Sequence, residues 1–153
     1  MEDLRYWDSD CFLGWLQAEA DKERECQDVL EAAKDGKVRI ITSALTIAEV
    51  LMVKGKKPIP KANRAKVEAF FRSDFIVVRN ITRHIAEVGR GLVWDLNIRP
   101  KDALHVATAL DAKLSLFNTF DGNLIKKCNR IQPSGLIAER PRVVQPKLPF
   151  ENQ

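Results

Sequence analysis

The spacing of hydrophobic positions along this 153-residue chain changes repeatedly, and each change predicts a new element. Short apolar and β-branched runs predict strands. These runs lie at Leu4–Trp7, Val38–Ile41, Phe75–Val78 and near Leu116, with Val143–Val144 as a candidate last edge strand. Apolar residues at helical spacing predict the helices, which are a first one carrying Cys11 to Leu16, then Lys22–Lys34, Ala44–Val53, Lys61–Arg72, Thr82–Leu96, one from Pro100, and a short one over Asp121–Asn129. Because strands and helices alternate, we predict an α/β fold with a mostly parallel sheet and helices on both of its faces.

The stretch from Arg99 to Asp121 places one acidic residue at a helix start and another after the next predicted strand. Pro100 suits a first helical position, because its missing N–H would have no partner there in any case. A buried face follows at helical spacing, at Ala103, Val106, Ala107 and Leu110. Asp102 lies in the first turn, and Asp121 follows the next predicted strand. The ends of strands and the starts of helices meet at one edge of such a sheet, which is where ligands bind.

The predicted helix Ala44–Val53 is apolar nearly all round, a pattern typical of a buried helix. Glu49 lies in its middle. A carboxylate in a buried helix is costly unless it is paired or bound to a metal ion. Thr46 to Glu49 also fits a capping box, which would start the helix at Thr46. Ser43 is an equally good cap and would leave Glu49 well inside the helix.

Four acids are therefore candidates for one site. Asp8 follows the first predicted strand, Asp102 begins a helix, Asp121 follows the fourth strand, and Glu49 lies within the helix after the second strand. Each has a structural alternative, since Asp8, Asp10 and Asp121 could be N-caps and Asp102 could complement a helix dipole. A set of carboxylates without a cysteine cluster favours a hard cation, Mg²⁺ or Mn²⁺. Such a cation neutralises carboxylates that would otherwise repel one another. A pair of such ions can activate water for phosphodiester cleavage.

Charge, cysteine content and the lack of long apolar runs indicate where this protein is located and what kind of partner it prefers. The formal net charge is +4, a mild preference for a polyanionic partner. The three cysteines form no Cys-x-x-Cys pair and are expected to be buried or idle thiols in a reducing cytoplasm. There is no signal peptide, and no apolar run is long enough to span a bilayer. We therefore expect a single-domain cytoplasmic protein without a membrane association.

Four stretches of the chain resemble the motifs of the PIN-domain family, and most of all those of VapC-type toxin ribonucleases from toxin–antitoxin pairs. They are Tyr6-Trp7-Asp8-Ser9, Thr42-Ser43-Ala44-Leu45-Thr46 with Glu49, Pro100 to Leu110, and Asn118-Thr119-Phe120-Asp121. The resemblance runs from about residue 4 to residue 145. It implies a three-layer α/β/α sandwich, with 1–145 as a single PIN-like nuclease domain and 146–153 as a loose C-terminal tail.

The resemblance also implies an endoribonuclease that uses one or two Mg²⁺ or Mn²⁺ ions to cleave single-stranded regions of RNA. Asp8, Asp102 and Asp121 would bind metal, and Glu49 would bind it directly or through water. A metal-activated water would attack the phosphorus, leaving a 5′-phosphate and a 3′-hydroxyl. Thr119 and Ser9 would support these carboxylates.

One position departs from the family pattern. Asp10 stands where a small neutral polar residue is usual. It is either a fifth metal-binding carboxylate or a helix cap that points elsewhere.

Basic residues and partners complete the expectation. Arg99 and Lys101 flank Asp102, and Lys54, Lys56 and Lys57 form a basic loop. These side chains either contact RNA phosphates, which would make binding salt-sensitive, or lie on a solvated face. The resembled toxins bind an antitoxin in an apolar groove and form homodimers or larger assemblies. In this chain such a groove could involve the first two helices or Lys61–Arg72.

Two other functions remain open at the level of sequence. The chain could be a catalytically inactive PIN fold that only binds RNA or protein. Asp8-Ser9-Asp10 also resembles the Asp-x-Asp of haloacid-dehalogenase-like phosphatases, with Asp8 as nucleophile and Asp10 as general acid. His105 lies one turn after Asp102, so it either touches substrate or is a packed, hydrogen-bonded histidine.

Overall fold

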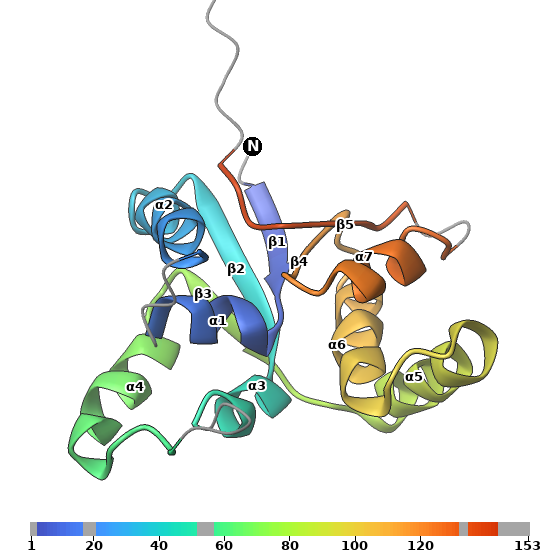
Figure 1. Cartoon of the computed structure of the whole chain (residues 1–153), viewed down its shortest axis with the longest axis horizontal. Coiled ribbons are helices and arrows are strands. Elements are labelled where there is room, and N and C mark those ends of the chain that lie inside the picture. The colour runs from blue at the N-terminus through green and yellow to red at the C-terminus, as the bar shows by residue number, and fades with distance from the viewer. Residues whose placement is uncertain (1–2, 17–20, 52–56, 132–134, 144–153) are drawn as a thin grey trace, which may run out of the picture.

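The computed structural model describes residues 3–16, 21–51, 57–131 and 135–143 (Figure 1). Its sheet has five strands in the order β3-β2-β1-β4-β5, and every neighbouring pair is parallel. The strands are β1 (Asp3–Trp7), β2 (Val38–Ser43), β3 (Ile76–Arg79), β4 (Leu116–Asn118) and β5 (Ile137–Glu139). The predicted parallel sheet is therefore confirmed.

Helices connect successive strands. They are α1 (Ser9–Leu16), α2 (Glu23–Lys34), α3 (Ala44–Glu49), α4 (Arg64–Phe71) after a 3₁₀ turn at Lys61–Asn63, α5 (Arg83–Leu96), α6 (Pro100–Asp111) and α7 (Gly122–Cys128). Thr82 caps α5 and Pro100 opens α6, as their positions in the sequence predict. Within the described ranges, each helix is too short or too polar to traverse a lipid bilayer.

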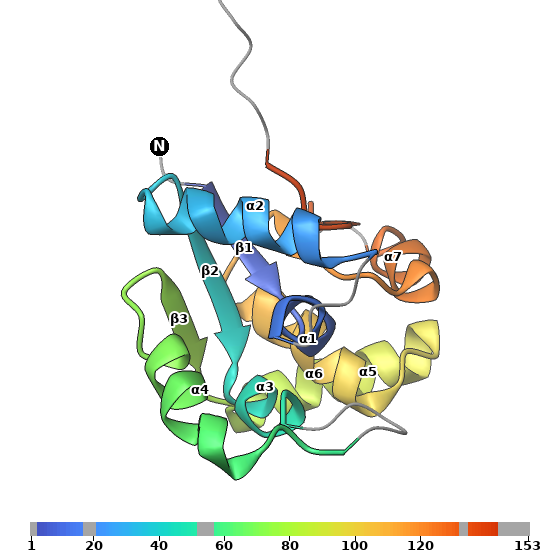
Figure 2. The same ribbon diagram turned by 60° about the vertical axis from the view of Figure 1, so that its left-hand side comes forward.

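The sheet separates two hydrophobic cores, which makes the fold a three-layer sandwich. Successive residues of a strand point to opposite faces, so Tyr6 and Trp7 of β1 enter different cores. Trp7 packs with α1, α2 and α4, and Tyr6 packs with α5, α6 and α7. Figure 1 shows these two sets of helices on either side of the sheet, and Figure 2 looks onto the side covered by α2.

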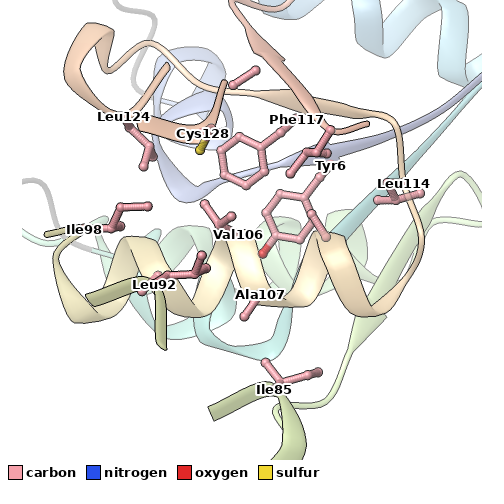
Figure 3. Packing of buried hydrophobic residues seen from close by; sticks show 14 of the residues in the cluster. Tyr6, Ile85, Leu92, Ile98, Val106, Ala107, Leu114, Phe117, Leu124 and Cys128 are labelled. Atoms are coloured by element: carbon pink, nitrogen blue, oxygen red, sulfur yellow. The ribbon is translucent and has the colours of Figure 1, made fainter. Parts of the chain in front are cut away.

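Helix α6 is the best-packed element on its side of the sheet. Val106 and Ala107 are completely buried. Val106 points towards Tyr6 and Phe117, whose rings stack with centroids 5.0 Å apart, and Ala107 points to the other side of the helix, towards Ile85 (Figure 3). Leu92 of α5 covers the same helix from outside. The apolar face predicted for α6 is therefore the centre of this core.

The prediction for the helix that carries Glu49, Ala44–Val53, is wrong in two respects. Helix α3 ends at Glu49, and Val50 occupies its C-cap position. Met52 and Val53 of the predicted helix fall outside the described residues. The helix is not buried, because Ile47 is 44 % exposed and Leu51, just beyond it, is 46 % exposed. The physical reason is its place in the fold: α3 lies at the carboxyl end of β2 rather than over a sheet face (Figure 1), so no second layer formed by the described residues covers its outer side.

The last strand is also misplaced in the sequence prediction. The edge strand is Ile137–Glu139, where Leu116 pairs with Ile137 and Asn118 with Glu139. Val143 lies beyond it outside any strand, and Val144 falls outside the described residues. Pro141, which has no N–H to give to a ladder, separates the two segments. The predicted tail 146–153 also lies outside the described residues.

Candidate active site

The predicted acids all belong to the carboxyl edge of the sheet. Asp8 directly follows β1, Glu49 ends α3, Asp102 lies in the first turn of α6, and Asp121 precedes α7. Asp10 is the second residue of α1. The charges of Asp121, Asp10 and Glu49 all act on Asp102, and the charge of Asp10 acts on Asp8. The fold therefore brings residues 113 positions apart into one electrostatic neighbourhood.

Asp8 is the most deeply buried of these carboxyl groups, at 3 % exposure. Burial, and then the charge of Asp10, raise the pKa of Asp8 from 3.8 to about 7. His105, the Thr119 hydroxyl and the Cys11 backbone act in the opposite direction. The Cys11 N–H donates to Asp8 Oδ1 at 3.3 Å, so Asp8 caps α1. A buried carboxyl that resists ionisation is well suited to a cation, which would stabilise its charged form.

Asp102 is half-buried, and its pKa is also raised. Burial is the main cause, opposed by His105 and reinforced by the negative charges of Asp121, Asp10 and Glu49. Mutual repulsion of this kind is what a bound divalent cation relieves.

Glu49 has a different environment. Its side chain is 19 % exposed, and its Oε1 lies 2.7 Å from His105 Nε2. Ser9 Oγ donates to Oε2 at 3.4 Å. Burial tends to raise the pKa of Glu49, but the hydrogen bond with His105 and the charge of Lys101 outweigh it, so the pKa is lowered. Glu49 is thus stabilised as an anion by its neighbours rather than buried in mid-helix.

The cap of α3 is now defined. Ser43 Oγ accepts from the Leu45 N–H at 3.1 Å, so the helix starts after Ser43 and the capping box at Thr46 does not form. Because α3 is short, this cap places Glu49 at the end of the helix. Ser9, predicted as a supporting residue, lies against Glu49.

Asp121 is exposed and adopts the N-cap alternative. Its Oδ1 accepts from the backbone N–H groups of Asn123 at 2.9 Å and Leu124 at 3.2 Å. Thr119 is buried, and its hydroxyl accepts from the Asp121 N–H at 3.2 Å. A carboxylate has about four lone-pair sites on two oxygens, so these two bonds leave acceptor capacity for a further ligand.

The carboxylate oxygens of the site are ligands that suit a hard divalent cation, but their arrangement does not form a complete metal-binding site. Among the described residues, no group of three or more His, Cys, Asp or Glu side chains is arranged to hold a metal ion. Asp8 and Asp121 are turned to helix caps, and Glu49 to His105. The metal ion, its ligand set and the part of Asp10 in it stay predictions.

Sequence reasoning included a packed, hydrogen-bonded role for His105, and it named Tyr6 as part of a motif without giving it a role. His105 is buried, with Nδ1 2.6 Å from the Tyr6 hydroxyl and Nε2 on Glu49, so it is a packed, hydrogen-bonded histidine. One signal could have revealed Tyr6. It stands two residues before Asp8, on the same face of β1, and so points to the side of the sheet where α6 lies.

The basic residues divide into two groups. Arg99 and Lys101 are exposed at the start of α6, and the charge of Lys101 stabilises Glu49. Lys57 is exposed beyond α3. Lys54 and Lys56 fall outside the described residues.

Comparison with known proteins gives a consistent family. A model of the PIN domain family matches residues 5–129. The structure is similar to that of VapBC2 from Rickettsia felis bound to a DNA fragment from its promoter, with a TM-score of 0.63, 17 % identity, and coverage of 90 % of this chain and 98 % of that one. No curated protein sequence is detectably similar to the chain.

Two further structures share the fold. A toxin–antitoxin complex from Klebsiella pneumoniae has a TM-score of 0.55 and 21 % identity, over 92 % of this chain and 99 % of that one. VapC20 from Mycobacterium tuberculosis, a toxin that cleaves the sarcin–ricin loop, has a TM-score of 0.59 and 14 % identity, over 78 % of this chain and 92 % of that one. At these identities the likeness concerns the fold.

Proposed function

This chain belongs to the PIN domain family, and from that premise we propose that it is a Mg²⁺- or Mn²⁺-dependent endoribonuclease acting on single-stranded regions of RNA. The observation that carries the proposal is the pair Asp8 and Asp102. Both pKa values are raised, by burial and by neighbouring acids, at the edge of a parallel sheet where ligands bind. Strongly perturbed carboxyls in such a place favour a function over a purely structural role.

The residues proposed to hold the cation are Asp8, Asp102 and Asp121, with Glu49 acting directly or through water and Asp10 as a fifth carboxylate. A bound Mg²⁺ or Mn²⁺ supplies an activated water and stabilises the leaving oxygen, so the expected products are a 5′-phosphate and a 3′-hydroxyl.

Other side chains would orient these carboxylates and the substrate. Ser9 holds Glu49, and the Thr119 hydroxyl holds the backbone of Asp121. Arg99 and Lys101 are exposed next to Asp102, which suits them to attract RNA phosphates.

The test is cleavage of total cellular RNA with Mn²⁺, Mg²⁺ or a chelator, because a selective enzyme could ignore an arbitrary oligonucleotide. Asp102→Asn keeps the shape of the site but removes one negative charge, so we expect it to lose more than roughly 100-fold in cleavage, beyond the usual cost of changing a metal's outer partners. Asp95→Asn, the same change at an exposed position of α5, is the matched control. Equal cleavage by Asp102→Asn and the parent, or cleavage in chelator, contradicts the proposal.

One observation favours a second candidate, a PIN fold that binds RNA without cutting it: the described acids do not form a ready three-ligand cage. Metal-independent RNA binding without any cleavage, in protein free of a co-purified inhibitor, would support that function. A chromogenic phosphomonoester, tested alongside, separates the phosphatase alternative.

We further propose an antitoxin partner and place it on a groove between α3, α4 and β3. The groove has a volume of about 720 Å³. Its apolar lining residues are Ile47, Leu51, Ile59, Val67, Phe71 and Val78. Its charged lining residues are Lys61, Arg64 and Arg72 and one acid, Glu68, which pairs with Arg64, so bases outnumber acids three to one. The predicted apolar faces of α1 and α2, in contrast, are part of the core. Apolar walls with a basic edge suit a segment with apolar anchors and acidic neighbours.

Leu51→Arg tests this groove, because it puts a charge on an exposed apolar wall without touching the core. Co-purification with the product of the adjacent gene should be lost, while RNA cleavage by the free protein persists. Unchanged co-purification would place the partner elsewhere.

Self-association into a homodimer or larger assembly belongs to the same proposal. Trp94 of α5 is 75 % exposed and lies beside a shallow apolar surface formed with Val93, Pro100 and Leu104. The Arg90 guanidinium lies over its ring, 5.3 Å from the centroid. Light scattering should give a mass above one chain, and Trp94→Ala should lower it.

A further inference from the structure

A continuous line of short contacts joins the core to the candidate site. It starts at the Tyr6 hydroxyl on β1, passes through the His105 imidazole on α6, and ends at the Glu49 carboxylate on α3. The two contacts measure 2.6 and 2.7 Å, and the residues are 99 and 56 positions apart in the chain. Tyr6 is itself held by Phe117, whose ring stacks on it.

The chemistry of the two ends sets the direction of the hydrogen bonds. Burial, and then the negative charges of Asp8 and Glu49, raise the pKa of Tyr6 well above its ordinary value, so the phenol keeps its proton and can donate it to Nδ1. A neutral imidazole carries one N–H, which is then on Nε2 and faces the Glu49 carboxylate. The other tautomer would point the lone pair of Nε2 at a carboxylate oxygen, which is repulsive.

Glu49 needs such a restraint because its own helix, α3, is short and makes few buried contacts. Helix α3 has six residues, of which Thr46 is the buried one, and Glu49 is the last. Asp102, in contrast, stands on a helix packed along its whole length. Without His105, Glu49 would depend on the weaker contact from Ser9, at 3.4 Å.

We propose that Tyr6 and His105 are positioning residues that act through Glu49: Tyr6 fixes the imidazole with its Nε2–H towards α3, and His105 holds the Glu49 carboxylate at the site. The inference rests on the proposed function in so far as Glu49 serves a bound cation. It implies that α6 contributes twice to the site, directly with Asp102 and through His105 with Glu49.

The first arm of the test needs no metal ion. The chain has two histidines, and His84 is exposed, so the imidazole ¹⁵N spectrum of the metal-free protein isolates His105. We expect a slowly exchanging proton on Nε2 and an unprotonated Nδ1. Tyr6→Phe should shift Nδ1, and Glu49→Gln should shift Nε2. A proton on Nδ1 with a bare Nε2 would overturn the inference whether or not the protein binds a metal ion.

The second arm uses two substitutions that each keep one half of the imidazole. His105→Gln places an amide N–H near the position of Nε2, and His105→Asn places one near Nδ1. Binding of Mn²⁺, measured by electron paramagnetic resonance, should weaken by roughly 10- to 100-fold in His105→Asn, the usual cost of losing a partner of a metal-binding carboxylate. His105→Gln should recover most of that loss, and His84→Asn should show none.

A double-mutant cycle separates positioning from general damage. If His105 acts through Glu49, then His105→Asn adds no further loss of Mn²⁺ affinity in a Glu49→Gln background. Additive losses, or equal losses in the Gln and Asn variants, would contradict the inference. If the parent protein binds no Mn²⁺, the proposed function fails, and the ¹⁵N arm still decides whether His105 donates to Glu49.

Discussion

Helices α3 and α6 bring acids to the same site by opposite means. Helix α6 has 12 residues and no side-chain cap, and its position follows from a buried face that includes Val106 and Ala107. Helix α3 has six residues, and its position follows from hydrogen bonds: the Ser43 cap, the contact of 2.7 Å between the Thr42 and Thr46 hydroxyls, and the bond between Glu49 and His105. One acid is fixed by packing and the other by polar contacts.

The contrast shows that apolar composition alone does not say what a helix does with its surface. The apolar residues of α6 fill a core between the sheet and α5. Ile47 of α3, and Leu51 two residues beyond its end, line an open groove instead, because α3 lies beyond the end of the sheet. The same sequence pattern thus gives a buried, rigid support in one place and an open apolar groove in the other.

The largest expected difference between the two helices is the loss of stability when a charge is placed on each. Val106→Asp buries an unpaired carboxylate, so we expect a loss of about 4 kcal/mol or more in the free energy of unfolding, enough to unfold much of the protein. Ile47→Asp, on the open side of α3, should stay within about 0.5 kcal/mol of the parent. Urea unfolding followed by circular dichroism measures both. A collapse of Ile47→Asp as well would mean that α3 is covered.

The charge of Asp8 gives the next largest effect. Its folded pKa of about 7 lies above the ordinary 3.8, so the folded chain binds more protons between these values, and stability falls as the pH rises from about 4 to 7. In chelator, Asp8→Asn should therefore stabilise the protein at pH 8, by at most about 4 kcal/mol at about 1.36 kcal/mol per pKa unit, and flatten the pH dependence of Tm. Asparagine also keeps the cap of α1.

Glu49→Gln is the matched comparison, with the opposite sign. The pKa of Glu49 is lowered, so its charge contributes stability above its ordinary value of 4.5 that is lost as the pH falls. The substitution should not stabilise the protein at pH 8. If both variants gain stability equally, the two acids do not differ as described.

A smaller effect distinguishes the N-cap of α3, Ser43, from the N-cap of α5, Thr82. Ser43→Ala and Thr82→Ala each remove a hydroxyl that accepts from a backbone N–H at a helix start, at a cost of about 1 kcal/mol in unfolding free energy. Only the loss at Ser43 should also weaken Mn²⁺ binding, because α3 carries Glu49 and has little packing to keep its place. Equal Mn²⁺ affinities in the two variants would show that α3 holds its position without the cap.

The smallest effect concerns RNA binding, measured by fluorescence anisotropy with the cleavage-deficient Asp102→Asn protein. Affinity should fall as salt rises, and Lys101→Ala should reduce the slope of log affinity against log salt by about 0.7, one single-strand phosphate contact. Lys57→Ala, an exposed lysine beyond α3, should change the slope less. Indifference of the affinity to salt would argue against phosphate contacts by either lysine.

Local patterns predicted much of the fold and part of the site. Pro100 and Thr82 marked two helix starts correctly, because helix termini leave backbone groups whose partners are encoded nearby. Asp8, Asp102 and Asp121 were expected at the sheet edge and are found there. The end of α3 was missed because an apolar run continues past Glu49 in the sequence whether or not a layer covers it. The strand at Ile137 was missed in favour of Val143 because three residues give too short a pattern.

By itself, the sequence determined the alternation of strands and helices and the placing of acids at their ends, since both depend on neighbours along the chain. Only the tertiary structure decided which acids lie close enough to shift one another's pKa and which of them serve as caps. It also decided that Tyr6 and Glu49 both hydrogen-bond to His105. The reason is physical. Parallel strands and their crossovers bring distant segments together, and those contacts determine how far a side chain is buried and which hydrogen-bond partners it has. A local sequence pattern does not contain that information.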